Sequence, residues 1–145
     1  VGDSSKYEYA TQMGSDYIYN HTSTEWISNI KEDLRGEKVN IVFEHVGLST
    51  WDKSLKLLAK GGRIVTCGAT TGADVSINLA HLFMKQQSIL GSTMSSIESF
   101  REVMKLIEKK AFIPFVDKVY SFSDIKKAHK SIEDRKQFGK IVLVP

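Results

Sequence analysis

The sequence predicts an α/β fold in which a doubly wound, mostly parallel sheet lies between helices. Segments with strand character alternate with segments of helical periodicity, and the links between them are short. Residues 39–43 and 64–67 are nearly continuous apolar runs, which are typical of strands covered on both faces. Parallel strands of this kind require right-handed crossovers through helices.

The strands of this sheet are predicted from short runs that are rich in Ile, Val or Tyr and lack proline. They are residues 17–20, 39–44, 63–67 and 88–91. Thr22 and Glu25 form a candidate capping box before one intervening helix. Ser49 and Asp52 open a second helix, which we expect to end at Gly61.

The pattern changes after about residue 95. A helix that begins near Ser95 is followed by a predicted strand at 116–122, a helix at 123–133 and a final strand at 140–144. Residues 111–114 break this pattern, so we place a boundary between residues 113 and 114.

Composition restricts the class of protein. The chain has 145 residues, of which 41% are apolar and 26% charged, so it can fill one core and is not disordered. No apolar run approaches the roughly 20 residues that cross a bilayer, and one cysteine cannot form an internal disulfide. The net charge of +3 is small, so we expect no nucleic-acid partner. Without a long apolar run or a secretory signal pattern, and with one cysteine, we expect no membrane association and a cytoplasmic location.

Ligands of open α/β sheets bind beyond the carboxyl ends of the strands. Small residues follow three of the predicted strands, and they would let a ligand approach the backbone closely. These candidate residues are Val46 and Gly47, then Gly68, Ala69 and Thr70, and finally Gly91 and Ser92. Alone, such tips indicate an anionic or nucleotide-like ligand, although many are only tight turns.

The amino-terminal residues indicate more specifically which nucleotide could bind. If Val1 ends a strand, Gly2 stands where an NAD-preferring fold places a carboxylate for the ribose 2′-hydroxyl. Ser4, Ser5 and Lys6 could then hold a 2′-phosphate through hydroxyl groups and one positive charge. The alternatives are a serine N-cap of a helix with a solvated lysine, or a role for Asp3 as that carboxylate one residue late.

Four motifs in a fixed order resemble the medium-chain dehydrogenase/reductase superfamily, in the branch of the NADPH:quinone oxidoreductases and zinc alcohol dehydrogenases. They are MGSDYIYNH (13–21), VNIVFEHVG (39–47), LLAKGGRIVTCG (57–68) and QFGKIVL (137–143). The resemblance implies a Rossmann-like cofactor domain that is incomplete, because the sequence has no G-x-G-x-x-G turn. We expect a portion of a longer enzyme, inactive alone, with the cofactor domain at 1–113 and a return segment at 114–145 that packs on a catalytic domain.

The resemblance implies hydride transfer between NADP(H), or NAD(H), and a small carbonyl, quinone or alcohol. Ser4, Ser5, Lys6 and His21 would meet the adenosine 2′-phosphate, although His21 has an equal alternative as an exposed loop histidine. Val46 and Gly47 would line the adenosine side. Gly68, Ala69, Thr70, Gly91 and Ser92 would lie by the nicotinamide, and Lys140 would reach the cofactor from the last strand. A non-catalytic nucleotide-binding module is the alternative of a different class.

No catalytic or metal-binding residue is predicted. Glu44 and His45 are adjacent on a strand and point to opposite faces, so they do not suit acid–base catalysis as a pair. The superfamily's zinc ligands come from the catalytic domain, so this chain leaves the question of zinc open. An apolar stripe from Val75 to Phe83 indicates either core packing or a homodimer through the sheet edge.

Overall fold

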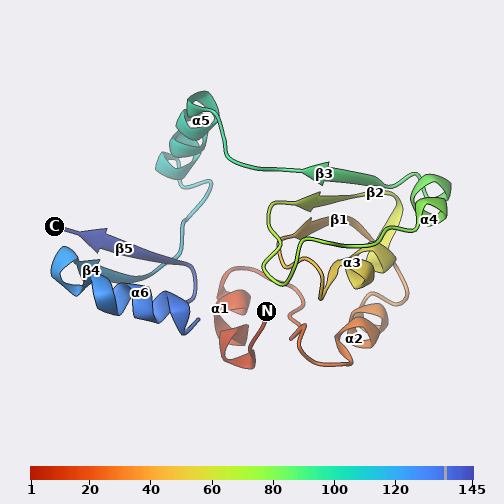
Figure 1. Cartoon of the computed structure of the whole chain (residues 1–145), viewed down its shortest axis with the longest axis horizontal. Helices are drawn as coiled ribbons and strands as arrows, with labels where there is room; N and C mark the ends of the chain where they lie inside the picture. Colours follow the sequence, from red (N-terminus) through yellow and green to blue (C-terminus); the bar gives the residue numbers. More distant parts are fainter. Residues whose placement is uncertain (136) are drawn as a thin grey trace. The chain divides into compact units, whose positions relative to one another are not determined.

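The computed structural model describes residues 1–135 and 137–145, which form two compact units, 1–94 and 95–145. Figure 1 shows the elements of each unit along the chain. The second unit begins just before helix α5 (Ile97–Glu108), whereas the sequence analysis placed a functional boundary after residue 113. That boundary between functional domains stays a prediction.

The first unit contains a parallel sheet of three strands, as the apolar runs predict. Strands β1 (Val39–Glu44), β2 (Leu58–Thr66) and β3 (Ser88–Gly91) lie in the order β1-β2-β3, and both pairs are parallel. Helices α3 (Trp51–Leu57) and α4 (Leu79–Met84) belong to the connections between them. The Rossmann-like α/β class is therefore confirmed, and the carboxyl ends of all three strands lie at one edge.

The core of this unit lies between α3 and one face of the sheet. Trp51 of α3 packs with Leu58 and Ile64 of β2, and all three side chains are buried. Because side chains alternate along a strand, the intervening residues face the other way. Ile41 and Phe43 of β1 are accordingly exposed.

Strand β2 begins earlier than the sequence predicts. The pattern of residues 57–62 favours a helix that ends at Gly61, but α3 ends at Leu57 and the strand starts at Leu58. Long-range contacts decide the outcome: Leu58 pairs with Val39, and the Gln87 side chain donates hydrogen bonds to the carbonyls of Leu58 and Ala59. Local helical preference yields to this tertiary pairing.

The strand predicted at residues 17–20 is wrong: this segment belongs to no strand of the structure. It is held instead by Val1, whose amino group donates to the Tyr19 carbonyl at 2.9 Å, while the His21 amide donates to the Val1 carbonyl at 3.0 Å. This is the hydrogen-bond pattern of one parallel bridge, so the extended conformation is present but the pairing extends over a single position.

Three short helical segments surround this bridge: a 3₁₀ turn η1 (Ser4–Lys6), α1 (Tyr7–Gln12) and α2 (Trp26–Asp33). The capping box predicted from Thr22 and Glu25 does not form, because α2 begins later, with Glu25 itself at the N-cap. The Asn20 side chain accepts hydrogen bonds from the amide and hydroxyl groups of Thr22, which closes a turn there instead.

The second unit contains α5 and a parallel pair of strands, β4 (Val116–Ser121) and β5 (Lys140–Val144). The 3₁₀ turn η2 (Phe122–Asp124) and α6 (Ile125–Glu133) connect the two strands, as the sequence predicts. The N-cap of α5 is Ser96, one residue after the predicted start, and its hydroxyl accepts a hydrogen bond from the Ser99 amide. Among the described residues, no helix has the length and apolar character needed to span a membrane.

Candidate functional site

The loops that follow β1 and β2 are bonded into one continuous edge. The amides of Thr70 and Thr71 donate to the carbonyls of His45 and Val46, at 3.3 and 2.8 Å. In the opposite direction, the amide of Leu48 donates to the Gly72 carbonyl at 3.1 Å. These bonds fix the position of the two loops relative to one another.

Gly47 is essential to this close approach. Its φ is +88°, and a Cβ there would lie 2.4 Å from the Gly72 carbonyl oxygen and 3.1 Å from the Ala69 Cα. Both the left-handed backbone and the contact exclude larger residues. Gly68 is similar in part, since its Cβ would lie 3.2 Å from the His45 oxygen. Two of the predicted ligand-contacting glycines therefore serve loop packing.

The Glu44 carboxylate organises the same edge from beneath. It is buried, and it accepts hydrogen bonds from the amides of Val46 and Gly47 at 2.7 and 3.2 Å. The hydroxyl groups of Thr50 and Ser54 on the α3 side also donate to it, at 3.0 and 2.7 Å.

Burial alone would raise the pKa of the Glu44 carboxyl, but the bonds from Ser54, the two amides and Thr50 outweigh this effect and hold the pKa below its ordinary value of 4.5. An ionised carboxylate whose oxygens are occupied by four protein donors is a structural group. The expectation that Glu44 and His45 do not act as a catalytic pair agrees with this geometry, since His45 is exposed while Glu44 is buried.

Sequence reasoning did not find the role of Glu44, Thr50 and Ser54. The available signal was the spacing of the two hydroxyl residues, four positions apart at the start of a helix that follows the strand. Such a pair presents two donors on one helix face toward the end of the strand.

The outer surface of the edge consists of Gly68, Ala69 and Thr70, which are all exposed. Within the described part of the chain, no acceptor is bonded to the amides of Gly68 and Ala69, whereas the amides of the next residues are used between the loops. Ser92 follows β3 directly, and its amide donates to the Thr66 carbonyl at 2.9 Å, which aligns Gly91 and Ser92 with the end of β2. The edge therefore combines free backbone donors with very little side-chain bulk.

The amino-terminal turn is capped by Asp3. Its carboxylate accepts a hydrogen bond from the Ser5 amide at 2.7 Å, and hydrogen bonding from the Ser5 side chain, followed by this amide bond, lowers the Asp3 pKa. Ser4 and Ser5 are exposed on the turn, and Lys6 follows them. The cap is thus Asp3, not a serine.

His21 lies against this amino-terminal segment. A Cβ on Gly2 would be 3.3 Å from the His21 Nε2 atom. Burial lowers the pKa of the His21 imidazole, and the positive charge of the chain's amino terminus lowers it further. The ring is therefore neutral at pH 7, so it can donate or accept a hydrogen bond there but brings no positive charge.

A cavity of about 310 Å³ joins the amino-terminal segment to the end of β1. Val1, Tyr19 and His21 line one side, and Glu44 and Val46 line another. Its volume is at the lower end of the range typical of small-molecule sites. The cavity brings His21 and Val46 together from distant parts of the sequence. Its lining does not include Ser4, Ser5 and Lys6, or the exposed tip at residues 68–70.

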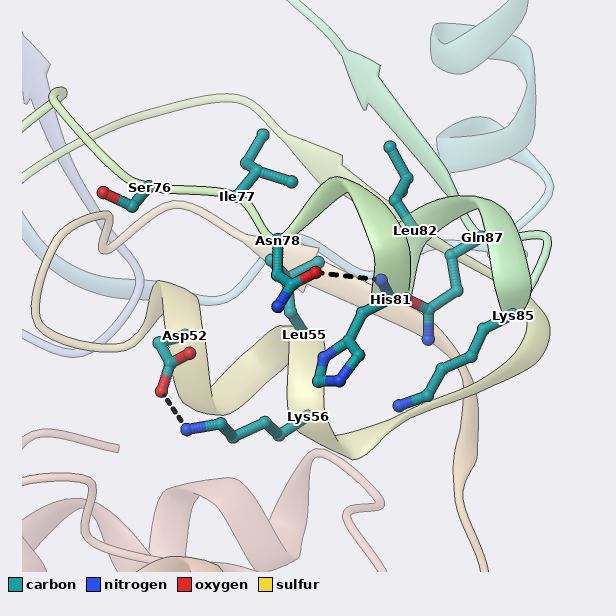
Figure 2. Close-up of a pocket in the computed structure, with 10 residues that line it drawn as sticks. All are labelled: Asp52, Leu55, Lys56, Ser76, Ile77, Asn78, His81, Leu82, Lys85 and Gln87. Atoms are coloured by element: carbon teal, nitrogen blue, oxygen red, sulfur yellow. Dashed lines mark hydrogen bonds and ion pairs between the residues drawn. The ribbon is translucent and has the colours of Figure 1, made fainter.

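A second cavity, between α3 and α4, is too small for a cofactor. Figure 2 shows its lining, with the Asp52–Lys56 ion pair on α3 and the Asn78 side chain accepting from the His81 amide at the start of α4. Its volume of about 40 Å³ has room for only one or two water molecules.

Lys140, the last predicted cofactor residue, belongs to the second unit at the start of β5, where its amide donates to the Phe115 carbonyl. Within residues 1–135 and 137–145, no group of three or more His, Cys, Asp or Glu side chains is arranged to hold a metal ion.

Comparison with known proteins agrees with this architecture. Residues 1–109 match the family model described as zinc-binding dehydrogenase. Quinone oxidoreductase 1 of Escherichia coli is 27% identical over all of this chain and 48% of its own length. Crotonyl-CoA reductase of Streptomyces avermitilis is 33% identical, over 77% of this chain and 25% of its own length.

Among solved structures, the crystal structure of an NAD-dependent alcohol dehydrogenase aligns with a TM-score of 0.86 and 31% identity, covering 100% of this chain and 42% of that one. The chain thus spans between a quarter and about half the length of these relatives.

Proposed function

The chain belongs to the zinc-binding dehydrogenase family, and we propose that it forms the cofactor-binding part of an oxidoreductase that transfers a hydride between NADP(H) and a small carbonyl, quinone or alcohol. The observation that carries the proposal is the cavity between the amino-terminal segment and the end of β1, at the carboxyl edge of a parallel sheet. Ligands of open α/β sheets bind at this edge.

Each part of the edge has a separate task in this proposal. Ser4, Ser5 and Lys6 bind the ribose 2′-phosphate through two hydroxyl groups and one ammonium group, and the neutral His21 ring donates a hydrogen bond beside them. Val46 and Gly47 form the adenosine wall, which the Glu44 network keeps rigid.

The exposed tip lies by the nicotinamide. Within the described residues, Gly68 and Ala69 offer free amides, Thr70 adds little bulk, and Gly91 and Ser92 lie at the neighbouring strand end. Lys140, at the start of β5, is a further proposed cofactor contact. When bound, the dinucleotide supplies the hydride, while these residues orient it and select it. Among the residues that the structure describes, no group of three or more His, Cys, Asp or Glu side chains could hold a zinc ion, so no step is derived through zinc.

The alternative within enzymes is an NAD-dependent dehydrogenase, in which Asp3 accepts a hydrogen bond from the ribose 2′-hydroxyl. The Asp3 carboxylate already accepts a hydrogen bond from the Ser5 amide, and it lies on an exposed turn where a ribose hydroxyl group could reach it. A similar solved structure is described as an NAD-dependent alcohol dehydrogenase, which favours this alternative. The serines and Lys6 favour NADP.

A binding measurement separates the two cofactors. In Lys6→Ala, the calorimetric affinity for NADPH should fall about tenfold, because one charged hydrogen bond to the phosphate is lost. The affinity for NADH should change less than about twofold, since NADH has no 2′-phosphate. Lys60→Ala, an exposed lysine near the start of β2, is the matched control. Equal losses for both cofactors would contradict the phosphate assignment and favour the NAD alternative, and no binding of either by the unchanged chain would contradict the cofactor role itself.

We also propose that two copies of the chain associate through the edge next to β3. Among the described strands, β3 pairs with β2 on one side and with none on the other. Leu79 and Phe83 of α4, nearby in the sequence, are 68% and 70% exposed. Unpaired edges with apolar surroundings favour association. Phe83→Glu should convert a dimer into a monomer in analytical ultracentrifugation, and Met94→Glu, at another exposed apolar residue, should not. A monomer before any substitution would refute the dimer.

A further inference from the structure

A concave basic surface lies in the second unit, on residues of β4 and α6. Figure 1 labels these two elements. The concave surface encloses about 380 Å³, and four lysine side chains line it together with two hydroxyl groups. The lining residues are Lys118, Tyr120, Lys126, Lys127, Lys130, Ser131 and Asp134. The proposed cofactor uses none of them.

The charge of this pocket is only partly neutralised by the protein. Lys127 pairs with Asp124 at 2.8 Å, and Lys130 pairs with Asp134 at 2.8 Å. Lys118 and Lys126 have no carboxylate within ion-pair distance in the described part of the chain. Each pair joins an exposed lysine to a half-buried aspartate three or four positions away, so the lysine ammonium group stays in contact with solvent and can turn toward a ligand. The pocket therefore keeps an excess of two positive charges.

Two hydroxyl groups add neutral hydrogen-bond donors to the charged pocket. Ser131 is 9% exposed as a whole residue. A hydroxyl group at a pocket wall can donate a hydrogen bond to the oxygen atoms of a ligand. Ser131 lies in the wall of the pocket, and the half-buried Tyr120 provides a second hydroxyl there.

We propose that this pocket binds the phosphate group of a small molecule, either a phosphate ester or a diphosphate. Ammonium groups combined with hydroxyl donors are suited to phosphate oxygens, which accept several hydrogen bonds at once. A long polyanion such as nucleic acid fits less well, because Asp124 and Asp134 flank the lysines and would repel its neighbouring phosphates. The site stands independently of the proposed oxidoreductase function.

The test is a titration of the 145-residue chain with pyrophosphate, followed by amide NMR. We expect saturable shifts at Lys130 and Ser131. The double variant Lys118→Glu/Lys126→Glu should weaken binding at least about tenfold, because it reverses both unpaired charges. Ser131→Ala should weaken it about threefold with an unchanged circular-dichroism spectrum, since only one neutral hydrogen bond is lost. Lys109→Glu/Lys110→Glu is the control with the same change of charge, at the end of α5 and outside the pocket.

Three results would overturn the proposal. The first is the absence of saturable pyrophosphate binding. The second is a loss of pyrophosphate affinity in the control variant that equals the loss in the Lys118→Glu/Lys126→Glu variant. The third is amide shifts that anionic vesicles or DNA cause but pyrophosphate does not. A parallel titration with NADPH identifies the source of the phosphate. If NADPH shifts the Ser131 amide signal, the pocket binds a phosphate group of the cofactor. If pyrophosphate shifts this signal but NADPH shifts only signals of residues 1–94, the pocket binds a different phosphate compound.

Discussion

The two sides of the candidate cofactor site are built in different ways. The loops after β1 and β2 are joined by reciprocal backbone hydrogen bonds over a buried carboxylate, and Gly47 allows them to touch. The amino-terminal turn is exposed, and it is closed by its own Asp3 cap, by short-range backbone hydrogen bonds and by the bridge at Val1. The first side can fix the position of a ligand, whereas the second can change its sequence at little structural cost.

The largest effect is expected where the loops meet. Gly47→Ala should lower the free energy of unfolding by about 3 kcal/mol, because it combines a left-handed backbone with a contact to the Gly72 oxygen. Gly14→Ala is the matched control: its φ is +86°, but no atom lies within 4 Å of the added Cβ. That control should lose only about 1 kcal/mol. Urea unfolding measures both, and equal losses would show that the contact is relieved by a shift of the loop.

A smaller effect is expected for the carboxylate beneath the loops. Glu44→Gln should lower the free energy of unfolding at pH 7 by about 2 kcal/mol, because charged hydrogen bonds become neutral ones. The pKa of Glu44 is depressed in the folded chain, so this contribution is complete above its ordinary value of 4.5 and is lost as the pH falls through the lower, folded value.

The stability difference between Glu44→Gln and the unchanged chain should therefore narrow in acid. Denaturant unfolding at pH 7 and at successive lower values checks this trend. Glu37→Gln, at an exposed residue just before β1, is the control and should show no such trend. A difference that stays constant with pH would mean that shape, not charge, explains the loss.

The smallest global effect is expected at the amino-terminal turn. Asp3→Ala should speed hydrogen exchange at the Ser5 amide, because that amide loses its acceptor. The urea midpoint should stay close to that of the unchanged chain, since the turn is exposed and lies outside the core. Asp16→Ala, at an exposed residue after α1, should leave Ser5 exchange unchanged. A fall in the midpoint as large as that of Glu44→Gln would contradict the contrast between the two sides.

Local pattern predicted most strands correctly. The bounds of β1, β3 and β5 agree with the prediction because these runs are rich in β-branched residues and end near turn residues. The pattern failed where distant residues decide the outcome. Residues 58–62 read as the end of a helix, but pairing with Val39 and hydrogen bonds from Gln87 extend them into β2.

Similarly, the sequence predicts which loops form the candidate site but not the hydrogen bonds and contacts that hold these loops together. Strand ends and small residues indicated the loops, because topology places parallel strand ends at one edge. The hydrogen bonds that Glu44 receives from Thr50 and Ser54 depend on how α3 packs against β1, and this packing is a tertiary property. The close approach of the Gly72 carbonyl oxygen to Gly47, which leaves no room for a side chain there, likewise involves residues that are far apart in the sequence.

The shared carboxylate has a practical consequence for protein engineering. Because Glu44 bonds to the amides of Val46 and Gly47 and also to Thr50 and Ser54, these positions form one epistatic unit, and single substitutions within it should depend strongly on the others. A library that aims to exchange one nucleotide for another should therefore randomise residues 2–6 freely and vary 44–54 only in combination.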